Sequence, residues 1–154
     1  MKISEVLKPQ TIIPELKGTT KNEVIDELIN LFKDDERIID LVEVKNGVLE
    51  REKIMSTGVG HGFGIPHCKT NKVTEIVAAF GKTKEPIDFE ALDGDPVNLI
   101  FLLIGKDNLV APHIKLLSRI SLLMNKSEVR DKINAASTVE DIYSVFVEEE
   151  KNIS

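Results

Sequence analysis

The stretch Val97–Gly105 reads VNLIFLLIG and decides the fold class of this chain. It is a continuous apolar run of strand length, and such runs are typical of β-strands that are covered on both faces. A second run of this kind, IVAAFG, occupies 76–81. Between the two runs lie two groups rich in turn-forming residues, Lys84-Glu85-Pro86 and Asp93-Gly94-Asp95-Pro96. We therefore expect a sheet whose central strands lie between two layers.

Amphipathic segments on either side of these runs predict the helices. The first begins at Thr20, which forms a capping-box pattern with Glu23. Its apolar residues recur at helical spacing and define a buried face: Val24, Ile25, Leu28, Ile29 and Phe32. Later helices are expected over 41–55, from about Pro112, and over 128–135 and 139–149 behind the N-cap candidates Ser127 and Thr138. The helix near Pro112 is expected to carry one apolar side: Ile114, Leu117, Ile120 and Met124.

These segments predict one α/β sandwich domain, residues 1–154, in which helices pack over a central sheet. Residues 11–16 (TIIPEL) are expected to form an edge strand, because Pro14 cannot donate a ladder hydrogen bond. An apolar content of 42% is enough for a sizeable core. The formal net charge of −6 argues against general nucleic-acid binding, which needs a basic surface.

The cellular location is predicted from cysteine usage and hydropathy. A single cysteine, Cys68, allows no intramolecular disulfide and fits a reducing compartment. The first residues, MKISEVLKPQ, lack the apolar core of a signal peptide, and no run approaches the roughly 18 apolar residues of a membrane helix. We therefore expect a cytoplasmic protein.

The segment 51–72, REKIMSTGVGHGFGIPHCKTNK, contains the candidate functional residues. Glycine occupies positions 58, 60, 62 and 64, so in an extended chain the glycines would share one bare face. The opposite face would then be lined by Val59, His61, Phe63, Ile65 and His67. Four basic residues stand against Glu52 alone, a local charge of +3 that favours a small anionic group.

Several kinds of site are weighed on this pattern. Phe63 stands where a G-x-G-x-x-G loop needs its third glycine, and no G-K-[ST] follows, so nucleotide loops are excluded. The glycines can equally serve a bend that lets two elements pack closely. A metal site at His61, His67 and His113 lacks an H-x-x-x-H or C-x-x-C pair and is disfavoured. Cys68 can be a thiolate beside basic residues, but burial on the face opposite His67 is the favoured interpretation.

His67 is then the candidate nucleophile, because one imidazole nitrogen can attack phosphorus while the other donates an orienting hydrogen bond. Arg51 can stabilise phosphoryl charge, or it is a surface charge on a helix. His113 follows Pro112 near a helix N-terminus that favours anions, or it is a capping or packing residue.

The pattern R-E-x4-T-G-x-G-x-G-x-x-I-P-H over 51–67 resembles the active-site signature of the type 2 enzyme IIA domains of the bacterial sugar phosphotransferase system. Asp93-Gly94-x-Pro96-Val97 and His113-Ile114-x-Leu116-Leu117 extend the resemblance over nearly the whole chain. This family has fructose, mannitol, galactitol and nitrogen-related branches. The resemblance implies a mixed sheet flanked by helices on both faces, and no metal, nucleotide or other cofactor.

The resemblance also implies roles and partners. His67 accepts a phosphoryl group from phosphorylated HPr and passes it to a IIB component, which serves a membrane IIC permease. His113 is the second active-site histidine, and Arg51 the phosphate-binding residue. Two positions depart from the family pattern: His61 replaces a frequent asparagine, and Cys68 a usual glycine. A sugar-transport phosphocarrier and a regulator that binds targets according to His67 phosphorylation are both compatible with these residues.

Overall fold

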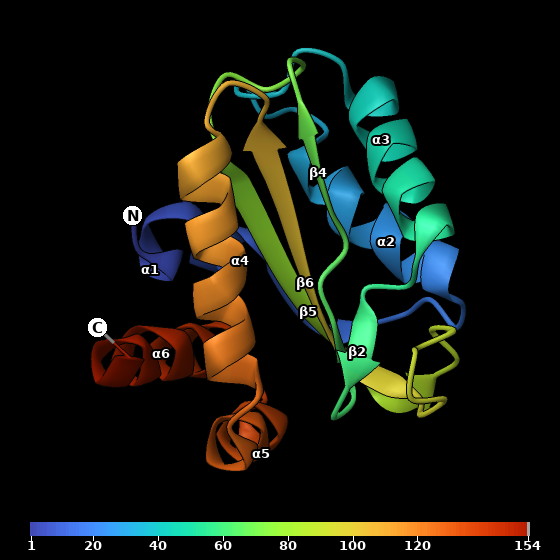
Figure 1. Cartoon of the computed structure of the whole chain (residues 1–154). Coiled ribbons are helices and arrows are strands. Elements are labelled where there is room, and N and C mark those ends of the chain that lie inside the picture. The colour runs from blue at the N-terminus through green and yellow to red at the C-terminus, as the bar shows by residue number, and fades with distance from the viewer. Residues whose placement is uncertain (154) are drawn as a thin grey trace.

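The computed structural model describes residues 1–153, and for Val59 only the backbone is considered. In this part of the chain, six strands form one mixed sheet with helices on both faces (Figure 1). The strands are β1 (Ile12–Leu16), β2 (Gly58–Gly60), β3 (Phe63–Gly64), β4 (His67–Thr70), β5 (Val77–Ile87) and β6 (Val97–Lys106). The helices are α1 (Ile3–Val6), α2 (Lys21–Ile29), α3 (Leu41–Ile54), α4 (Val110–Met124), α5 (Ser127–Ala135) and α6 (Val139–Glu150). The predicted fold class is confirmed.

Strand β6 is the centre of the sheet, whose order is β1-β5-β6-β3-β2 with β4 also paired to β6. β5 and β6 are antiparallel, whereas β3 and β4 both run parallel to β6. β1 lies at an edge, as its proline predicted, and pairs with β5 in parallel. The chain thus places β3 and β4 one after the other along the same side of β6.

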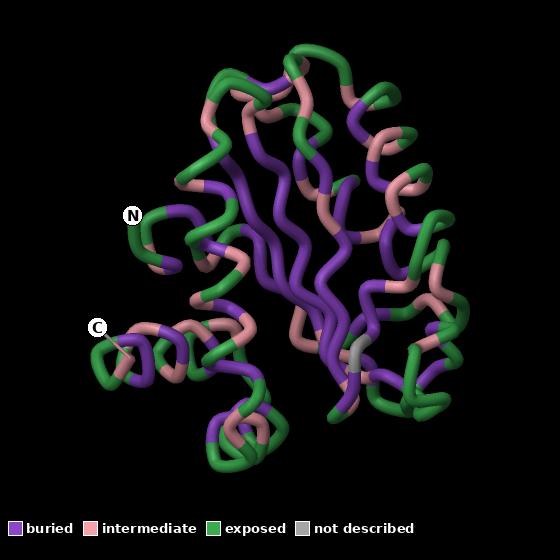
Figure 2. Tube along the Cα trace, viewed as in Figure 1, coloured by how far each residue is buried: buried purple, intermediate pink, exposed green. Residues whose placement is uncertain are grey.

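Strands β5 and β6 carry apolar residues at consecutive positions because each face of the sheet packs against its own hydrophobic core. On β6, alternate residues Leu99, Phe101 and Leu103 pack with α1, α4, α5 and α6. The residues between them, Ile100, Leu102 and Ile104, pack with α2 and α3. All six are at most 1% exposed, and Figure 2 shows the central strands as buried over most of their length. Both faces must therefore be apolar.

The helix boundaries follow the predicted caps closely. The Thr20 hydroxyl accepts a hydrogen bond from the Glu23 backbone N–H at 3.2 Å, and the predicted face of α2 is completely buried. Thr138 caps α6 in the same way through the Asp141 N–H. Ser127 was predicted as an N-cap but is the first residue of α5, which Lys126 precedes as the cap.

Two other local predictions, the turn at 84–86 and the burial of Ile114, are wrong. Lys84-Glu85-Pro86 was expected in a turn, but β5 continues through it to Ile87 across an irregularity in its pairing with β6. An irregular exposed stretch tolerates proline, which lacks an N–H. Helix α4 begins at Val110, with Pro112 in its first turn as predicted. Its buried face includes His113 and Leu116, so Ile114 is 57% exposed.

No helix within residues 1–153 has both the length and the apolar character to cross a membrane.

Candidate functional site

The glycine-rich segment forms a hairpin rather than the single extended face that was predicted. Gly60 pairs with Phe63, so His61 and Gly62 make a two-residue connection between β2 and β3. Both have positive φ, 59° and 78°, as in a type I′ turn. A Cβ on Gly64 would lie 2.8 Å from the Phe89 ring, so this glycine allows the ring to pack against β3. The close-packing interpretation is therefore confirmed at this position.

The hairpin separates His61 from His67. Phe63 pairs with Leu99 on β6, whereas His67 pairs with Leu103, four residues farther along the same strand. Four strand residues span about 13 Å. His61 is exposed at the hairpin tip and belongs to a different part of the surface. The prediction that it shares a face with His67 is wrong.

His67 begins β4, and a backbone carbonyl orients its ring. Its Nδ1 lies 2.7 Å from the Ile65 carbonyl oxygen. A carbonyl only accepts, so Nδ1 carries the ring proton and Nε2 keeps its lone pair. Burial lowers the pKa of the half-buried His67 ring and outweighs the Ile65 carbonyl, which raises it; the positive charge of Arg51 lowers it further. The neutral form with a nucleophilic Nε2 is therefore favoured at pH 7.

His113 lies beside His67, with ring centroids 5.8 Å apart. Its side chain packs on Gly105 of β6, where a Cβ would come within 2.2 Å of the His113 Nδ1. Burial, aided by the charges of His67 and Lys69, lowers the pKa of His113 to about 4. Its Nδ1 has no hydrogen-bond partner among the described residues. An unpaired acceptor is more common than an unpaired N–H, which favours the proton on Nε2.

His113 lies near the N-terminus of α4, as predicted. It is the fourth residue of the helix, and its backbone N–H donates to the Leu109 carbonyl oxygen. That N–H is therefore not one of the free groups that attract anions at a helix N-terminus. The side chain, not the helix end, brings His113 to the site.

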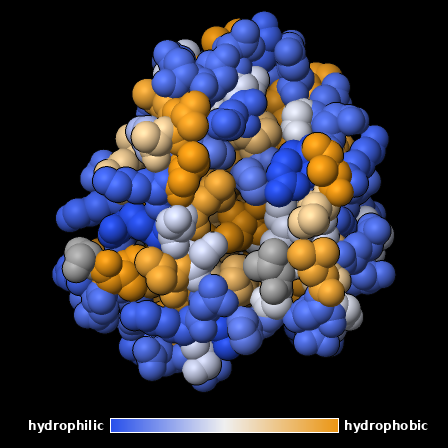
Figure 3. All heavy atoms as spheres, viewed as in Figure 1, coloured by the Kyte–Doolittle hydropathy of each residue, from blue (hydrophilic) through white to orange (hydrophobic). Residues whose placement is uncertain are grey.

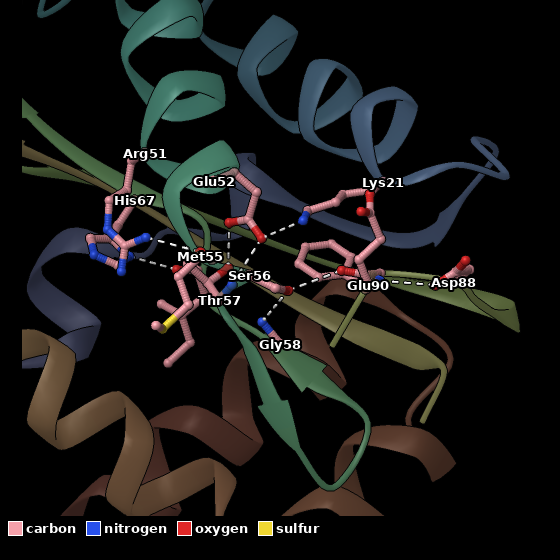
Figure 4. Close-up of polar contacts among 12 residues, drawn as sticks. Lys21, Arg51, Glu52, Met55, Ser56, Thr57, Gly58, His67, Asp88 and Glu90 are labelled. Carbon is pink, nitrogen blue, oxygen red and sulfur yellow. Dashed lines mark hydrogen bonds and ion pairs between the residues drawn. The ribbon is translucent and has the colours of Figure 1, made fainter. Parts of the chain in front are cut away.

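Arg51 lies in the last turn of α3 and points toward His67 (Figure 4). Its guanidinium donates to the Met55 carbonyl oxygen at 3.0 Å, which holds the side chain in place. Arg51, His67, Lys69 and His113 line one open hollow of about 520 Å³. Two cations therefore face a neutral histidine pair, an arrangement that can stabilise a phosphoryl group.

The rim of this hollow is apolar. Ile54 and Ile114 line it and are 80% and 57% exposed, and half-buried Leu117 also lines it. In Figure 3, hydrophobic residues surround a depression between α3 and α4. Exposed isoleucines beside a polar centre are typical of a surface that another protein contacts.

Cys68 lies on the opposite side of β4, as predicted. It is 6% exposed, and its thiol lies 3.9 Å from the Val44 carbonyl oxygen under α3. Burial raises the pKa of this thiol to about 12, so it stays protonated. Within residues 1–153, no group of three or more potential ligands is placed to hold a metal ion.

Sequence reasoning missed Lys69 and the polar contacts beneath Arg51. Lys69 follows His67 by two residues, and strand alternation places both on one face; this signal could have identified it. The contacts beneath Arg51 join Glu52 to Thr57 and to Lys21. Lys21 comes from another helix, so no spacing in the sequence could have revealed the pair.

An α/β sandwich that gathers two histidines and an arginine at a surface hollow defines the class of the protein. The chain belongs to the family of the phosphoenolpyruvate-dependent sugar phosphotransferase system, EIIA 2, whose profile matches residues 5–149.

Relatives of known name come from two branches. A nitrogen regulatory protein of Bradyrhizobium diazoefficiens is 37% identical over 150 residues, 95% of each chain. The fructose-specific EIIABC component of Bacillus subtilis is 34% identical over 151 residues. This second match covers 98% of the present chain but only 24% of that longer relative.

Solved structures confirm the architecture. The nitrogen regulatory protein IIA-Ntr of Neisseria meningitidis is similar with a TM-score of 0.87 and 30% identity, covering 94% of this chain and 98% of that one. Mannitol enzyme IIA of Escherichia coli, in its complex with phosphorylated IIB, has a TM-score of 0.78 at 18% identity, covering 93% and 99%. The latter likeness concerns the fold alone.

Proposed function

We propose that this protein is a cytoplasmic histidine phosphocarrier, which takes a phosphoryl group from phosphorylated HPr onto His67 and passes it to a IIB component for sugar uptake. The observation that carries the proposal is the 2.7 Å hydrogen bond between His67 Nδ1 and the Ile65 carbonyl. It directs the ring proton away from the hollow and leaves Nε2 as the nucleophile.

The transfer step needs no group beyond the two rings and the phosphoryl group. The Nε2 lone pair of His67 forms a bond to phosphorus while the bond between phosphorus and the donor histidine breaks. The electron pair of that bond returns to the donor ring, which carries a proton on its other nitrogen and so leaves as a neutral imidazole, while the loaded His67 ring takes over the positive charge. His67 keeps its Nδ1 proton on the Ile65 carbonyl throughout, so the protein need not supply or remove a proton.

Two neighbours support the developing charge. Arg51 is held beside His67 by the Met55 carbonyl and can donate to the equatorial oxygens of the phosphoryl group. His113, protonated on Nε2, can donate a neutral hydrogen bond from the other side of the hollow. Loss of one such donor typically slows a reaction on the order of 10²-fold.

The apolar rim supports a protein as the donor. The phosphohistidine of the donor must approach His67 within bonding distance, and exposed Ile54 and Ile114 provide an apolar contact surface around His67. A IIB component as the acceptor is supported by the family and by the complex of the mannitol enzyme IIA with phosphorylated IIB.

Labelling tests the proposal directly. The protein is incubated with phosphorylated HPr, and the acid-labile, base-stable phosphate is located by peptide mapping. We expect label on His67 and its loss in His67→Ala. The matched control His61→Ala removes the exposed histidine at the hairpin tip and should label normally. Label on another histidine, or none, refutes the proposal.

A regulatory role is the second candidate, supported by the nitrogen regulatory relative that matches over 95% of both chains. Such a protein would bind target proteins according to the phosphorylation of His67. Affinity capture with phosphorylated and unphosphorylated protein, compared with His67→Ala, separates the roles. Recovery of a kinase or channel in one state only favours regulation, whereas phosphoryl transfer to a IIB protein favours transport.

A further inference from the structure

Glu52 is a buried carboxylate one residue after Arg51, and its side chain points into the protein rather than into the hollow (Figure 4). It is 5% exposed. One carboxylate oxygen accepts from the Thr57 backbone N–H at 2.8 Å, and the other from the Thr57 hydroxyl at 2.7 Å. Lys21 of α2 completes the cluster with an ion pair of 2.8 Å.

The cluster is shielded on its outer side. The Lys21 side chain is 11% exposed, and its ammonium lies 5.0 Å from the centre of the Phe89 ring. The same ring packs against Gly64 of β3. Glu52 therefore joins α2, the end of α3 and the start of the glycine hairpin in one largely buried contact, at the edge of a polar hollow of about 480 Å³ that Lys21 and Glu52 also line.

Glu52 is connected to the nucleophile by consecutive hydrogen bonds and short chain segments. Its carboxylate holds both the N–H and the hydroxyl of Thr57. The Thr57 carbonyl accepts from the Ile65 N–H at 3.3 Å, and the Ile65 carbonyl in turn accepts from His67 Nδ1 at 2.7 Å. The Thr57 position thus influences where the acceptor for the His67 proton lies.

Glu52 is connected to Arg51 by a shorter route. Thr57 follows Met55 by two residues, and the Met55 carbonyl holds the Arg51 guanidinium. Fixing Thr57 therefore fixes the loop that leaves α3 and with it the orientation of Arg51. The same carboxylate is thus linked to both the nucleophile and the cation beside it.

Stability alone is a poor explanation for this cluster. Taking a carboxylate and an ammonium out of water costs several kcal/mol each, and well-packed apolar residues often stabilise a fold as much. What a fully satisfied buried carboxylate offers instead is fixed geometry. A displacement of 1 Å at a reacting group can slow a reaction by about 10²-fold.

We propose that Glu52 is a positioning residue for His67 and Arg51: by clamping Thr57 it holds the Ile65 carbonyl on His67 Nδ1 and the Met55 carbonyl on Arg51. The inference rests on the proposed phosphoryl transfer for its meaning, but not for its test. The predicted effect of Glu52 is on the tautomer and orientation of His67, which exist before any phosphoryl group arrives.

Nitrogen-15 NMR of the histidine rings reads the tautomer directly in unphosphorylated protein. In the native chain we expect the Nδ1–H form of His67 to predominate. In Glu52→Gln, which keeps the size but loses the charge, we expect a several-fold loss of that form. The rate of labelling by phosphorylated HPr should fall by ten- to a hundredfold.

Two further variants protect the conclusion from a folding effect. Thr57→Val keeps the β-branched shape and the N–H but loses the 2.7 Å hydroxyl contact, so it should shift the tautomer in the same direction. Glu150→Gln is the matched control. Glu150 is also buried and also accepts two backbone N–H groups, from Ile3 and Ser4, far from the hollow. It should lower the melting temperature and leave the His67 tautomer unchanged.

Each outcome has one meaning. If Glu52→Gln and Thr57→Val melt earlier but keep the native His67 tautomer and labelling rate, Glu52 is only structural and the inference is wrong. If the tautomer shifts as expected but native protein takes no label from phosphorylated HPr, the positioning role stands and the proposed function fails.

Discussion

Replacing Gly105 with alanine should impair the site although neither histidine of the site is substituted. Gly105 lies on β6 directly under His113, and an added Cβ would come within 2.2 Å of Nδ1 and 2.9 Å of Cγ and Cε1. β6 is fixed by β5 on one side and by β4 on the other, so the strand cannot retreat. The His113 ring must therefore move.

The size of the effect follows from the geometry. An ordinary contact begins near 3.4 Å, so the ring has to shift by about 1 Å. Overpacking of this kind costs about 1–3 kcal/mol of stability. A ring displaced by 1 Å loses its hydrogen bond to the transferring group, and the rate of labelling should fall by about 10²-fold.

A double-mutant cycle tests this reasoning. The free energy of unfolding is measured by urea denaturation for the native chain, Gly105→Ala, His113→Ala and the double variant. Once the ring is gone, the new methyl group has room, so Gly105→Ala should cost little in the His113→Ala background. A coupling of about 1–3 kcal/mol is expected. Additive costs would show that the methyl group and the ring do not meet, and the reasoning would fail.

Four further predictions concern the pH dependence of labelling, the pH dependence of stability, Cys68 and His61. Because burial lowers the pKa of His67, labelling should persist below the usual histidine range and disappear as the pH falls through the lowered pKa; loss already near pH 6.5 contradicts this. His113 has a pKa of about 4 in the folded chain against 6.5 for a free histidine, so between these values the unfolded chain binds more protons than the folded chain. The free energy of unfolding should therefore fall as the pH is lowered from 6.5 to 4, and it should fall less in His113→Leu. An equal fall in both proteins would refute this prediction. With a thiol pKa of about 12, Cys68 should resist alkylation at pH 8 until the chain unfolds, as followed by mass spectrometry. His61→Asn should leave labelling unchanged and raise the melting temperature slightly, because asparagine suits positive φ better.

The strands and helices were predictable where one physical rule decided the outcome. Val97–Gly105 is almost continuously apolar because both of its faces are buried, and this pattern is typical of a central strand. Thr20 and Thr138 are caps because their hydroxyls satisfy free N–H groups. The predicted burial of Ile114 was wrong because helical spacing does not determine which side of α4 faces the sheet. The polar His113 takes the buried position instead.

The residues that form the site were predictable from the sequence, but their arrangement in space was not. The structure brings Arg51, His67 and His113 together, while their roles in transfer stay predictions. The glycine hairpin was missed because glycines at alternate positions fit a strand and a turn equally, and His61-Gly62 is not the Asn-Gly pair that marks a type I′ turn. The Lys21–Glu52 pair joins residues 31 positions apart, beyond any local pattern.

The pairing with β6 is interrupted between β3 and β4, and this has a consequence for the energetics of phosphoryl transfer. Ile65 lies in the gap, so its carbonyl is spared from the β6 ladder and serves the His67 ring instead. In the proposed transfer Nδ1 donates to this carbonyl both before and after Nε2 is loaded. Because the loaded ring carries a positive charge, this hydrogen bond strengthens on loading rather than breaking. The acceptor therefore need not move when the ring gains or loses the phosphoryl group.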